Sequence, residues 1–217
     1  MKKTILFDLD GTIIDASVAI LQSFDYAFKF HNKPPVNHEY IKPLIGYTLE
    51  DIFLKIGVES HMIDSYFNAY RDFYHTIYLK HTTLLKYAKE AIIKANEFAD
   101  LGVVTTKGSK VLPDLLEHLG ILKYFKTLVG RHDVINPKPH AEPINLALRN
   151  LNKDNKISRA NTFMIGDTTL DVLSAINANV IPLSVLCGYN DEAKLSKVND
   201  KIFKNTFEAV EYALQYK

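Results

Sequence analysis

Two aspartates, Asp8 and Asp10, stand two residues apart in the segment DLDGT, which follows a short apolar run at residues 5–7. Side chains two residues apart in a strand point to the same side. Two crowded carboxylates favour retention of a proton on one of them, which suits hard-cation binding and a nucleophile paired with an acid or base. Gly11 lets the backbone turn closely around a bound anion. For this segment alone, a solvated surface turn and a calcium loop remain alternatives, although Gly11 is fourth rather than sixth in such a loop.

Three further apolar runs also lead into polar residues that could do chemistry. In chain order these residues are Thr105, Thr106, Lys138 and Asp167. Asp171 comes four residues after Asp167 and lies on the same face if a helix has begun. Singly, such residues are typical of turns, exposed loops and helix caps. Their chemical meaning therefore depends on whether the fold brings them together.

The apolar runs predict the strands that must position these residues. The runs are 5–7, 101–104, 128–130, 162–165, 180–185 and 202–203. Helical periodicity lies between them at about 109–119, with Ser109 as the N-cap, at about 141–151 and at about 169–177. This alternation implies parallel βαβ units in a three-layer, Rossmann-like α/β fold. Ligands of such sheets bind beyond the carboxyl ends of the strands, where the polar residues fall.

Residues 16–82 differ from the rest because they show helical periodicity but no strand-like run. Apolar and aromatic side chains recur there at helical spacing. The pattern predicts a small all-helical domain at 16–82, inserted after the first strand, and a catalytic core formed by 1–15 and 83–217. The aromatic spacing favours a packed helical core over a surface on which nucleotide bases stack.

The composition excludes several functional classes. The chain has 217 residues, with 26 basic and 25 acidic, so its formal net charge is +1, which argues against a nucleic-acid-binding protein. The single cysteine, Cys187, can form no intramolecular disulfide and indicates a reducing compartment. Asp8 and Asp10 interrupt the N-terminal apolar stretch too early for a secretion signal, and no run approaches the ~20 residues of a membrane span. We therefore expect a cytoplasmic protein that binds neither nucleic acid nor membrane.

The polar segments, taken in order, resemble the motifs of the haloacid dehalogenase superfamily of phosphotransferases. The segment DLDGT resembles the first motif, Thr105 the second, Lys138 within KPHAEP the third, and GDTTLD at residues 166–171 the fourth. Four motifs in order, with a helical insert after the first, are more specific than any one of them. The segments LGIL and VGRHD also resemble the phosphoglycolate phosphatase-like branch. The chain is therefore identified as resembling that branch, with a helical cap.

This resemblance implies a role for each aspartate. Asp8 would be the nucleophile that forms an aspartyl-phosphate, and Asp10 would act first as an acid and then as a base. Mg²⁺ would be bound by Asp8, by Asp167 and by Asp10 through its backbone carbonyl. Asp171 would orient Lys138 or a metal-bound water.

The same resemblance implies the phosphate-binding residues, which are Gly11, Thr105, Thr106 and Lys138. Lys138 would also be catalytic, because its charge offsets the repulsion between an anionic nucleophile and an anionic substrate. Many relatives have Asn where this chain has Thr106, so only the backbone N–H of Thr106 is expected to contact phosphate. Tyr47 lies in a segment that resembles the cap loop reaching into the site, and we expect it to influence specificity.

We therefore expect a Mg²⁺-dependent phosphatase that hydrolyses a small phosphomonoester, with phosphoglycolate as the first substrate suggested by resemblance. A pyrophosphatase, a nucleotidase or a sugar phosphomutase is the alternative on the same fold. Asp10 argues against a dehalogenase or a phosphonate hydrolase. A phospho-receiver switch is shorter and lacks the helical insert, and nothing indicates a degenerate metabolite sensor. The expected partner is a small phosphorylated metabolite, and the expected assembly is a monomer or a homodimer.

Overall fold

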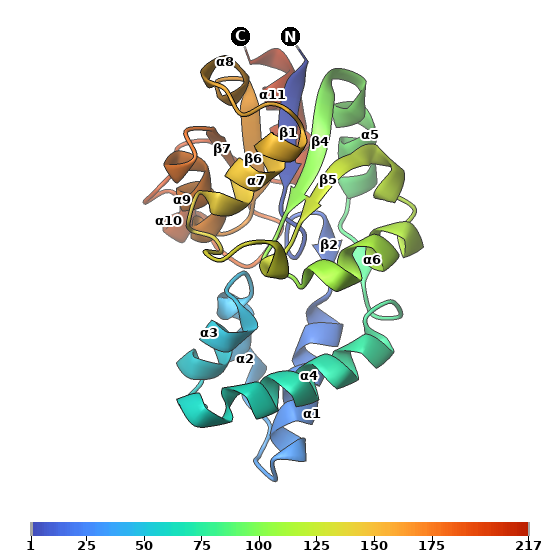
Figure 1. Cartoon of the computed structure of the whole chain (residues 1–217), viewed down its shortest axis with the longest axis vertical. Helices are drawn as coiled ribbons and strands as arrows, with labels where there is room; N and C mark the ends of the chain where they lie inside the picture. Colours follow the sequence, from blue (N-terminus) through green and yellow to red (C-terminus); the bar gives the residue numbers. More distant parts are fainter. Residues whose placement is uncertain (1, 217) are drawn as a thin grey trace.

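A parallel sheet of six strands lies at the centre of the upper part of the molecule in Figure 1. The computed structural model describes residues 2–216. The strand order is β5-β4-β1-β6-β7-β8, and every neighbouring pair is parallel. The strands are β1 (Lys3–Phe7), β4 (Ala99–Val104), β5 (Phe125–Val129), β6 (Thr162–Gly166), β7 (Ile181–Val185) and β8 (Ile202–Phe203). The predicted α/β fold with a parallel sheet is confirmed.

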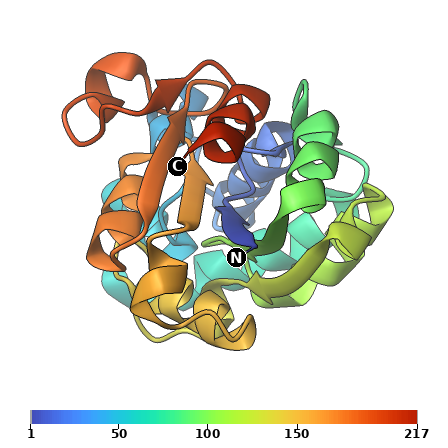
Figure 2. The ribbon, with the colours of Figure 1, turned by 90° about the horizontal axis from the view of Figure 1, so that it is seen from above.

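Helices cover both faces of this sheet (Figure 2). The sheet has a hydrophobic cluster on each face, and successive side chains of β1 point to opposite faces. Ile5 and Phe7 therefore belong to one buried cluster and Leu6 to the other. The first cluster includes α5 (Ala88–Phe98), α6 (Leu112–His118) and α11 (Thr206–Gln215), and the second includes α7 (Glu142–Asn150) and α9 (Thr169–Asn177). The connections contain the short helices α8 (Lys156–Arg159) and α10 (Glu192–Leu195). A strand buried on both faces reads as an unbroken apolar run, which is the pattern that predicted the sheet.

A second group of helices follows β1 and lies below the sheet in Figure 1. We call this group the helical segment; its helices are α1 (Ser17–Phe30), α2 (His38–Ile41), α3 (Leu49–Lys55) and α4 (Ile63–Ile77). Phe24 of α1 contacts Phe53 and Tyr70, with ring centroids 5.0 and 4.9 Å apart. An antiparallel pair, β2 (Ile14–Asp15) and β3 (Thr83–Leu84), joins the segment to the sheet. The aromatic side chains thus pack mainly against one another inside the segment.

Three strands begin before the apolar runs that predicted them: β1, which begins at Lys3 rather than 5, and β4 and β5. β4 begins at Ala99 rather than 101, and the reason is Asp100, a buried acidic residue that interrupts the run. The Lys126 ammonium donates to Asp100 at 2.7 Å, so a cross-strand ion pair compensates the buried charge. Lys126 itself interrupts the run of β5, which begins at Phe125 rather than 128.

The prediction of Ser109 as an N-cap is wrong. A 3-10 turn, Ser109–Val111, precedes α6, and the Ser109 hydroxyl donates to Asp133 at 2.7 Å instead of capping a helix. The other 3-10 turns are Lys42–Leu44, Ser60–Met62, Leu122–Tyr124 and Arg131–Asp133. Within residues 2–216, no helix has both the length and the apolar character that crossing a bilayer requires.

Candidate active site

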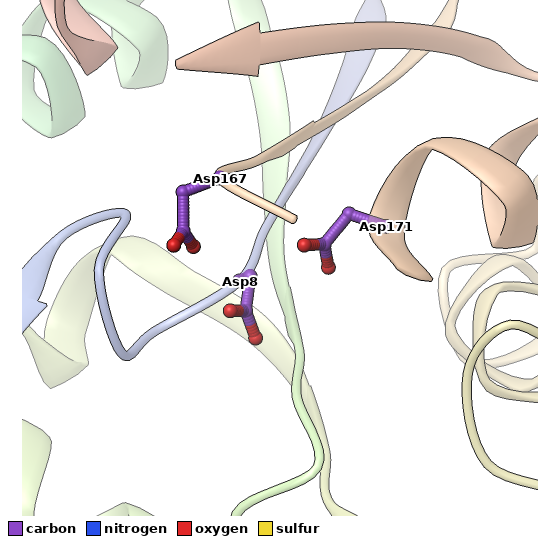
Figure 3. A group of neighbouring side chains, drawn as sticks. All are labelled: Asp8, Asp167 and Asp171. Carbon is purple, nitrogen blue, oxygen red and sulfur yellow. The ribbon is translucent and has the colours of Figure 1, made fainter. Parts of the chain in front are cut away.

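Three neighbouring strands bring the predicted chemical residues together at one edge of the sheet. β4, β1 and β6 are adjacent and parallel, so the residues that follow them meet. Asp8 follows β1 and Asp167 follows β6. Figure 3 shows the carboxylates of Asp8, Asp167 and Asp171 gathered at one point, and one oxygen of each lies within 4.8 Å of the others. All three residues are buried, so their charges interact strongly.

Lys138 links two of these carboxylates. Its ammonium donates to Asp8 Oδ1 at 2.9 Å and to Asp171 Oδ1 at 2.5 Å. The three side chains are at most 3% exposed. Burial acts to lower the pKa of Lys138, but the carboxylates of Asp171 and Asp8 outweigh it and raise the pKa above its ordinary value. Lys138 therefore stays charged in the centre of the site.

Asp8 holds its proton more tightly than an exposed aspartate does. Burial raises the pKa of Asp8 from 3.8 to about 6, against the lowering effect of Lys138 and with the added repulsion of Asp171 and Asp10. A carboxylate with this pKa is still mainly ionised near neutral pH. Asp8 therefore combines the charge that a nucleophile needs with a weakly solvated position.

Asp167 is bound by uncharged donors. The Thr12 hydroxyl donates to Oδ1 at 3.0 Å, and the backbone N–H of Tyr189 donates to Oδ2 at 2.8 Å. Burial, and then the charges of Asp8 and Asp171, raise the pKa of Asp167 well above its ordinary value. Among the described residues, no basic side chain forms an ion pair with Asp167. Its negative charge is thus the least compensated in the cluster.

Two glycines make room for the Asp167 carboxylate. A Cβ atom on either Gly11 or Gly188 would collide with it. Gly11 also has a φ of +83°, in the left-handed region that side chains disfavour. The requirement for glycine at position 11 is therefore both steric and conformational.

Asp171 has two structural partners in addition to its place in the cluster. Its Oδ2 accepts from the backbone N–H of Thr168 at 3.1 Å and from the Thr168 hydroxyl at 2.7 Å, which completes a capping box at the start of α9. Its Oδ1 accepts from Lys138. Because one oxygen pairs with the Lys138 ammonium and the other caps α9, Asp171 fits the predicted supporting role better than a metal-ligand role.

Asp10 is paired with Lys107, a residue that our sequence analysis did not single out. The Lys107 ammonium donates to Asp10 Oδ2 at 2.8 Å, and the two side chains are 7% and 11% exposed. Burial acts to lower the pKa of Lys107, but the charge of Asp10 holds it above its ordinary value. Asp10 Oδ1 is buried and has no hydrogen-bond partner among the described residues. The sequence did carry a signal for Lys107. Thr105 and Lys107 stand two residues apart, as Asp8 and Asp10 do, so in an extended segment their side chains point to the same side.

The remaining predicted residues lie around this centre. The Thr105 hydroxyl accepts from the backbone N–H of Lys107 at 3.2 Å. The Thr106 hydroxyl donates to the carbonyl oxygen of Gly46 at 2.9 Å, so it connects the end of β4 to the helical segment. Tyr47 lines the cavity next to this contact. The Thr106 side chain therefore joins two parts of the molecule, which leaves its backbone N–H as the group that suits a phosphate.

The buried cluster fits a divalent cation. When all three carboxylates are ionised, Asp8, Asp167 and Asp171 supply three negative charges against one positive charge on Lys138, which leaves two negative charges for a divalent cation to balance. Mg²⁺ prefers oxygen ligands and is usually bound through one or two carboxylates. Asp8 and Asp167 meet this requirement best, since Asp167 is held by uncharged donors only, whereas Asp171 pairs with the Lys138 ammonium through one oxygen and caps α9 through the other.

Comparison with known proteins assigns the family. The model of the haloacid dehalogenase-like hydrolases matches residues 5–185. The chain belongs to this family. It is 33% identical over 190 residues to the pyrophosphatase PpaX of Oceanobacillus iheyensis, which covers 87% of this chain and 86% of that protein. It is 30% identical to the "Probable phosphatase IndB" of Dickeya dadantii, over 97% of this chain and 92% of that one.

A solved structure agrees with this assignment. The haloacid dehalogenase-like protein SP0104 from Streptococcus pneumoniae matches with a TM-score of 0.86 at 26% identity, over 97% of this chain and 98% of its own. The motifs therefore predicted the family and the enzyme class, a phosphatase of the haloacid dehalogenase-like type, correctly.

Proposed function

We propose that this chain is a Mg²⁺-dependent phosphatase that hydrolyses a small phosphomonoester through a phosphoryl group carried on Asp8. The observation that carries the proposal is the buried cluster of Asp8, Asp167 and Asp171 around Lys138. It combines a nucleophile, a cation site and a fixed positive charge at the strand ends where ligands of such sheets bind.

In the first step, a carboxylate oxygen of Asp8 attacks phosphorus, and the bond from phosphorus to the leaving oxygen breaks. Asp10 donates a proton to that leaving oxygen. In the second step, Asp10 takes a proton from a water that attacks the phosphoryl group, and phosphate leaves Asp8. The unpartnered Oδ1 of Asp10 supports this role, because it is the oxygen that remains available for proton transfer.

Basic and neutral donors would hold the phosphate during both steps. Lys138 would bind phosphate oxygens while Asp171 keeps its ammonium in place. The Thr105 hydroxyl and the backbone N–H groups of Gly11 and Thr106 would complete the phosphate site.

The cation would be held by Asp8, Asp167 and the backbone carbonyl of Asp10. When bound, Mg²⁺ supplies positive charge that reduces the repulsion between the carboxylate and the phosphate. The Thr12 and Tyr189 hydrogen bonds keep the Asp167 carboxylate oriented for this purpose.

Residues 16–82 would act as a cap over a catalytic core of 1–15 and 83–217. The short β2–β3 pair supports this division, because within residues 2–216 the chain enters the helical segment after β2 and leaves it at β3. The hydrogen bond from Thr106 to Gly46 lies across the same boundary. A cap of this kind excludes water and contacts the leaving group.

Two substrates serve as references for this function. Phosphoglycolate is suggested by the motif resemblance, and pyrophosphate is suggested by the PpaX relatives, of which one is 33% identical to this chain. A pyrophosphatase would use the same Asp8 chemistry with phosphate as the leaving group.

Phosphate release tests the proposal. The panel contains phosphoglycolate, pyrophosphate, nucleoside monophosphates and sugar phosphates, each with and without Mg²⁺, for the natural protein and Asp8→Asn. We expect metal-dependent release that Asp8→Asn abolishes, while Glu97→Gln, an exposed acid-to-amide change on α5, retains it. Release that Asp8→Asn leaves intact, or isomerisation of a sugar phosphate faster than its hydrolysis, would refute it.

A further inference from the structure

A cavity of about 140 Å³ lies between the helical segment and the strand-end loops. Its wall on the catalytic side begins with Asp10, Thr106 and Lys107. Among the described residues, Asp8, Lys138 and Asp167 do not line it. The cavity therefore starts at the proposed acid and extends away from the phosphate site, which is where the leaving group of a phosphate ester must lie.

Much of the wall of this cavity is apolar. Its side chains come mainly from the helical segment and include Ile45, Leu49, Ile52, Phe67 and Tyr70. Apolar walls favour the transfer of apolar ligand surface from water, and give no hydrogen bonds to a small polar ion. This wall therefore suits a leaving group with a hydrocarbon or aromatic body.

Basic side chains also line the cavity. Arg71, Lys110 and Arg131 line it, together with two histidines. The Nε atom of Arg131 is buried and has no hydrogen-bond partner within residues 2–216. Buried donors are normally satisfied, so an unpartnered guanidinium N–H beside a cavity indicates an acceptor supplied by a ligand or a water.

Glu50 adds one acidic group to this lining. Its Oε2 is also buried without a partner in the described part of the chain. With Asp10 counted as well, the lining carries two acidic residues against four Lys and Arg side chains. The excess of positive charge favours an anionic group on the ligand, while Glu50 can accept from a hydroxyl or an amine.

We propose that the substrate is a phosphomonoester whose leaving group has an apolar body, typically a ring, and an anionic end that meets Arg131 and Lys110. This inference rests on the proposed phosphatase function and narrows its substrate class. At 10–15 Å³ for each water-sized group, the cavity has room for about ten non-hydrogen atoms. Glycolate fills roughly half of that space, and the phosphate released from pyrophosphate has no apolar surface to place against the wall.

Four phosphate esters separate the two features of this leaving group. Methyl phosphate has neither feature, phosphoglycolate has only the anion, phenyl phosphate has only the ring, and 4-carboxyphenyl phosphate has both. The quantity compared is the ratio of kcat/KM between variant and natural protein for each ester, because this ratio removes the intrinsic reactivity of the leaving group. The variants are Phe67→Ala, Phe67→Leu, Lys110→Gln and Arg131→Gln.

We expect Phe67→Ala to lower kcat/KM about 10-fold for the two aryl esters and less than about 2-fold for the two small ones. Phe67→Leu, which keeps apolar volume, restores part of that loss and guards against a folding defect. We expect Lys110→Gln and Arg131→Gln to lower kcat/KM about 5-fold for the two carboxylate esters only. The matched control is Lys89→Gln, an exposed lysine on α5 that should change nothing.

The outcomes separate this inference from the function beneath it. If neither these four esters nor any member of the phosphate-release panel above yields phosphate, the phosphatase proposal fails and the inference fails with it. If phosphate is released but the Phe67 and Arg131 variants affect all esters equally, the phosphatase proposal stands and the inference is wrong. A preference of the natural protein for pyrophosphate over every organic ester would also overturn it.

Discussion

At the residue scale, burying Asp8 lowers the stability of the folded protein but leaves its carboxylate weakly solvated, which favours its reactivity as a nucleophile. Burial holds the pKa of Asp8 at about 6, above the ordinary 3.8, so the folded protein binds this proton more tightly than the unfolded chain does. The free energy of unfolding contributed by Asp8 therefore falls as the pH rises from about 4 to about 6. Above about pH 6 the loss of stability caused by burying the charged Asp8 reaches its full value, on the order of 3 kcal/mol.

We expect Asp8→Asn to stabilise the metal-free protein at about pH 8, by roughly 1–3 kcal/mol, because the amide removes a buried charge. The gain should shrink as the pH falls and vanish near about pH 4, where Asp8 is protonated in both states. Urea unfolding between these pH values, with chelator present, measures it, and Glu97→Gln is the exposed control. A gain that does not change with pH, or a loss at about pH 8, would contradict the burial argument.

Lys107 acts on Asp10 rather than on phosphorus in this account. Its ammonium occupies Asp10 Oδ2 and leaves Oδ1 for the proton transfer. We expect Lys107→Gln to lower kcat about 10- to 100-fold for an alkyl phosphate, whose leaving oxygen needs a proton, and far less for 4-nitrophenyl phosphate, whose leaving oxygen does not. Lys107→Arg should recover part of the loss. Steady-state kinetics that show equal losses for both substrates would exclude this positioning role.

At the element scale, the loop between Ile45 and Thr48 connects catalysis to substrate choice. The Gly46 carbonyl accepts from Thr106 at the end of β4, and Tyr47 lines the cavity. We expect Tyr47→Ala to change the ratio of kcat/KM between large and small esters about 5- to 10-fold. Mg²⁺ affinity, measured by calorimetry in the same protein, should stay the same, because Tyr47 is not a cation ligand. An unchanged substrate ranking would show that this loop does not select substrates.

The elements also show what the sequence could and could not predict. The central strands were predictable because burial on both faces leaves unbroken apolar runs, as in residues 162–165. The start of β4 was missed because Asp100 is tolerated inside the sheet only through its lysine partners. The contact of Lys107 with Asp10 joins residues 97 positions apart, and the meeting of Glu50 with Arg131 in one cavity joins different parts of the fold. Such pairings depend on tertiary packing, which residue periodicity does not encode.

At the scale of the whole molecule, the charge of the buried cluster links metal binding to stability. We expect saturating Mg²⁺ to raise the melting temperature by about 5–10 °C, since it binds the folded state alone. Asp167→Asn should remove this increase. Asp10→Asn should keep it, because Asp10 is expected to contribute only its backbone carbonyl. Thermal unfolding of these variants measures the effect, and an increase that survives Asp167→Asn would place the cation elsewhere.

The central claim, that Asp8 carries the phosphoryl group, is tested most directly by trapping that group. In Asp10→Asn, with 4-nitrophenyl phosphate as substrate, the first step needs no acid and the second lacks its base, so the intermediate should accumulate. Acid quenching followed by peptide mass spectrometry should then show one phosphoryl group on Asp8, formed together with a burst of 4-nitrophenol. A burst without phosphorylated Asp8, a phosphoryl group on another residue, or the absence of both would contradict the account.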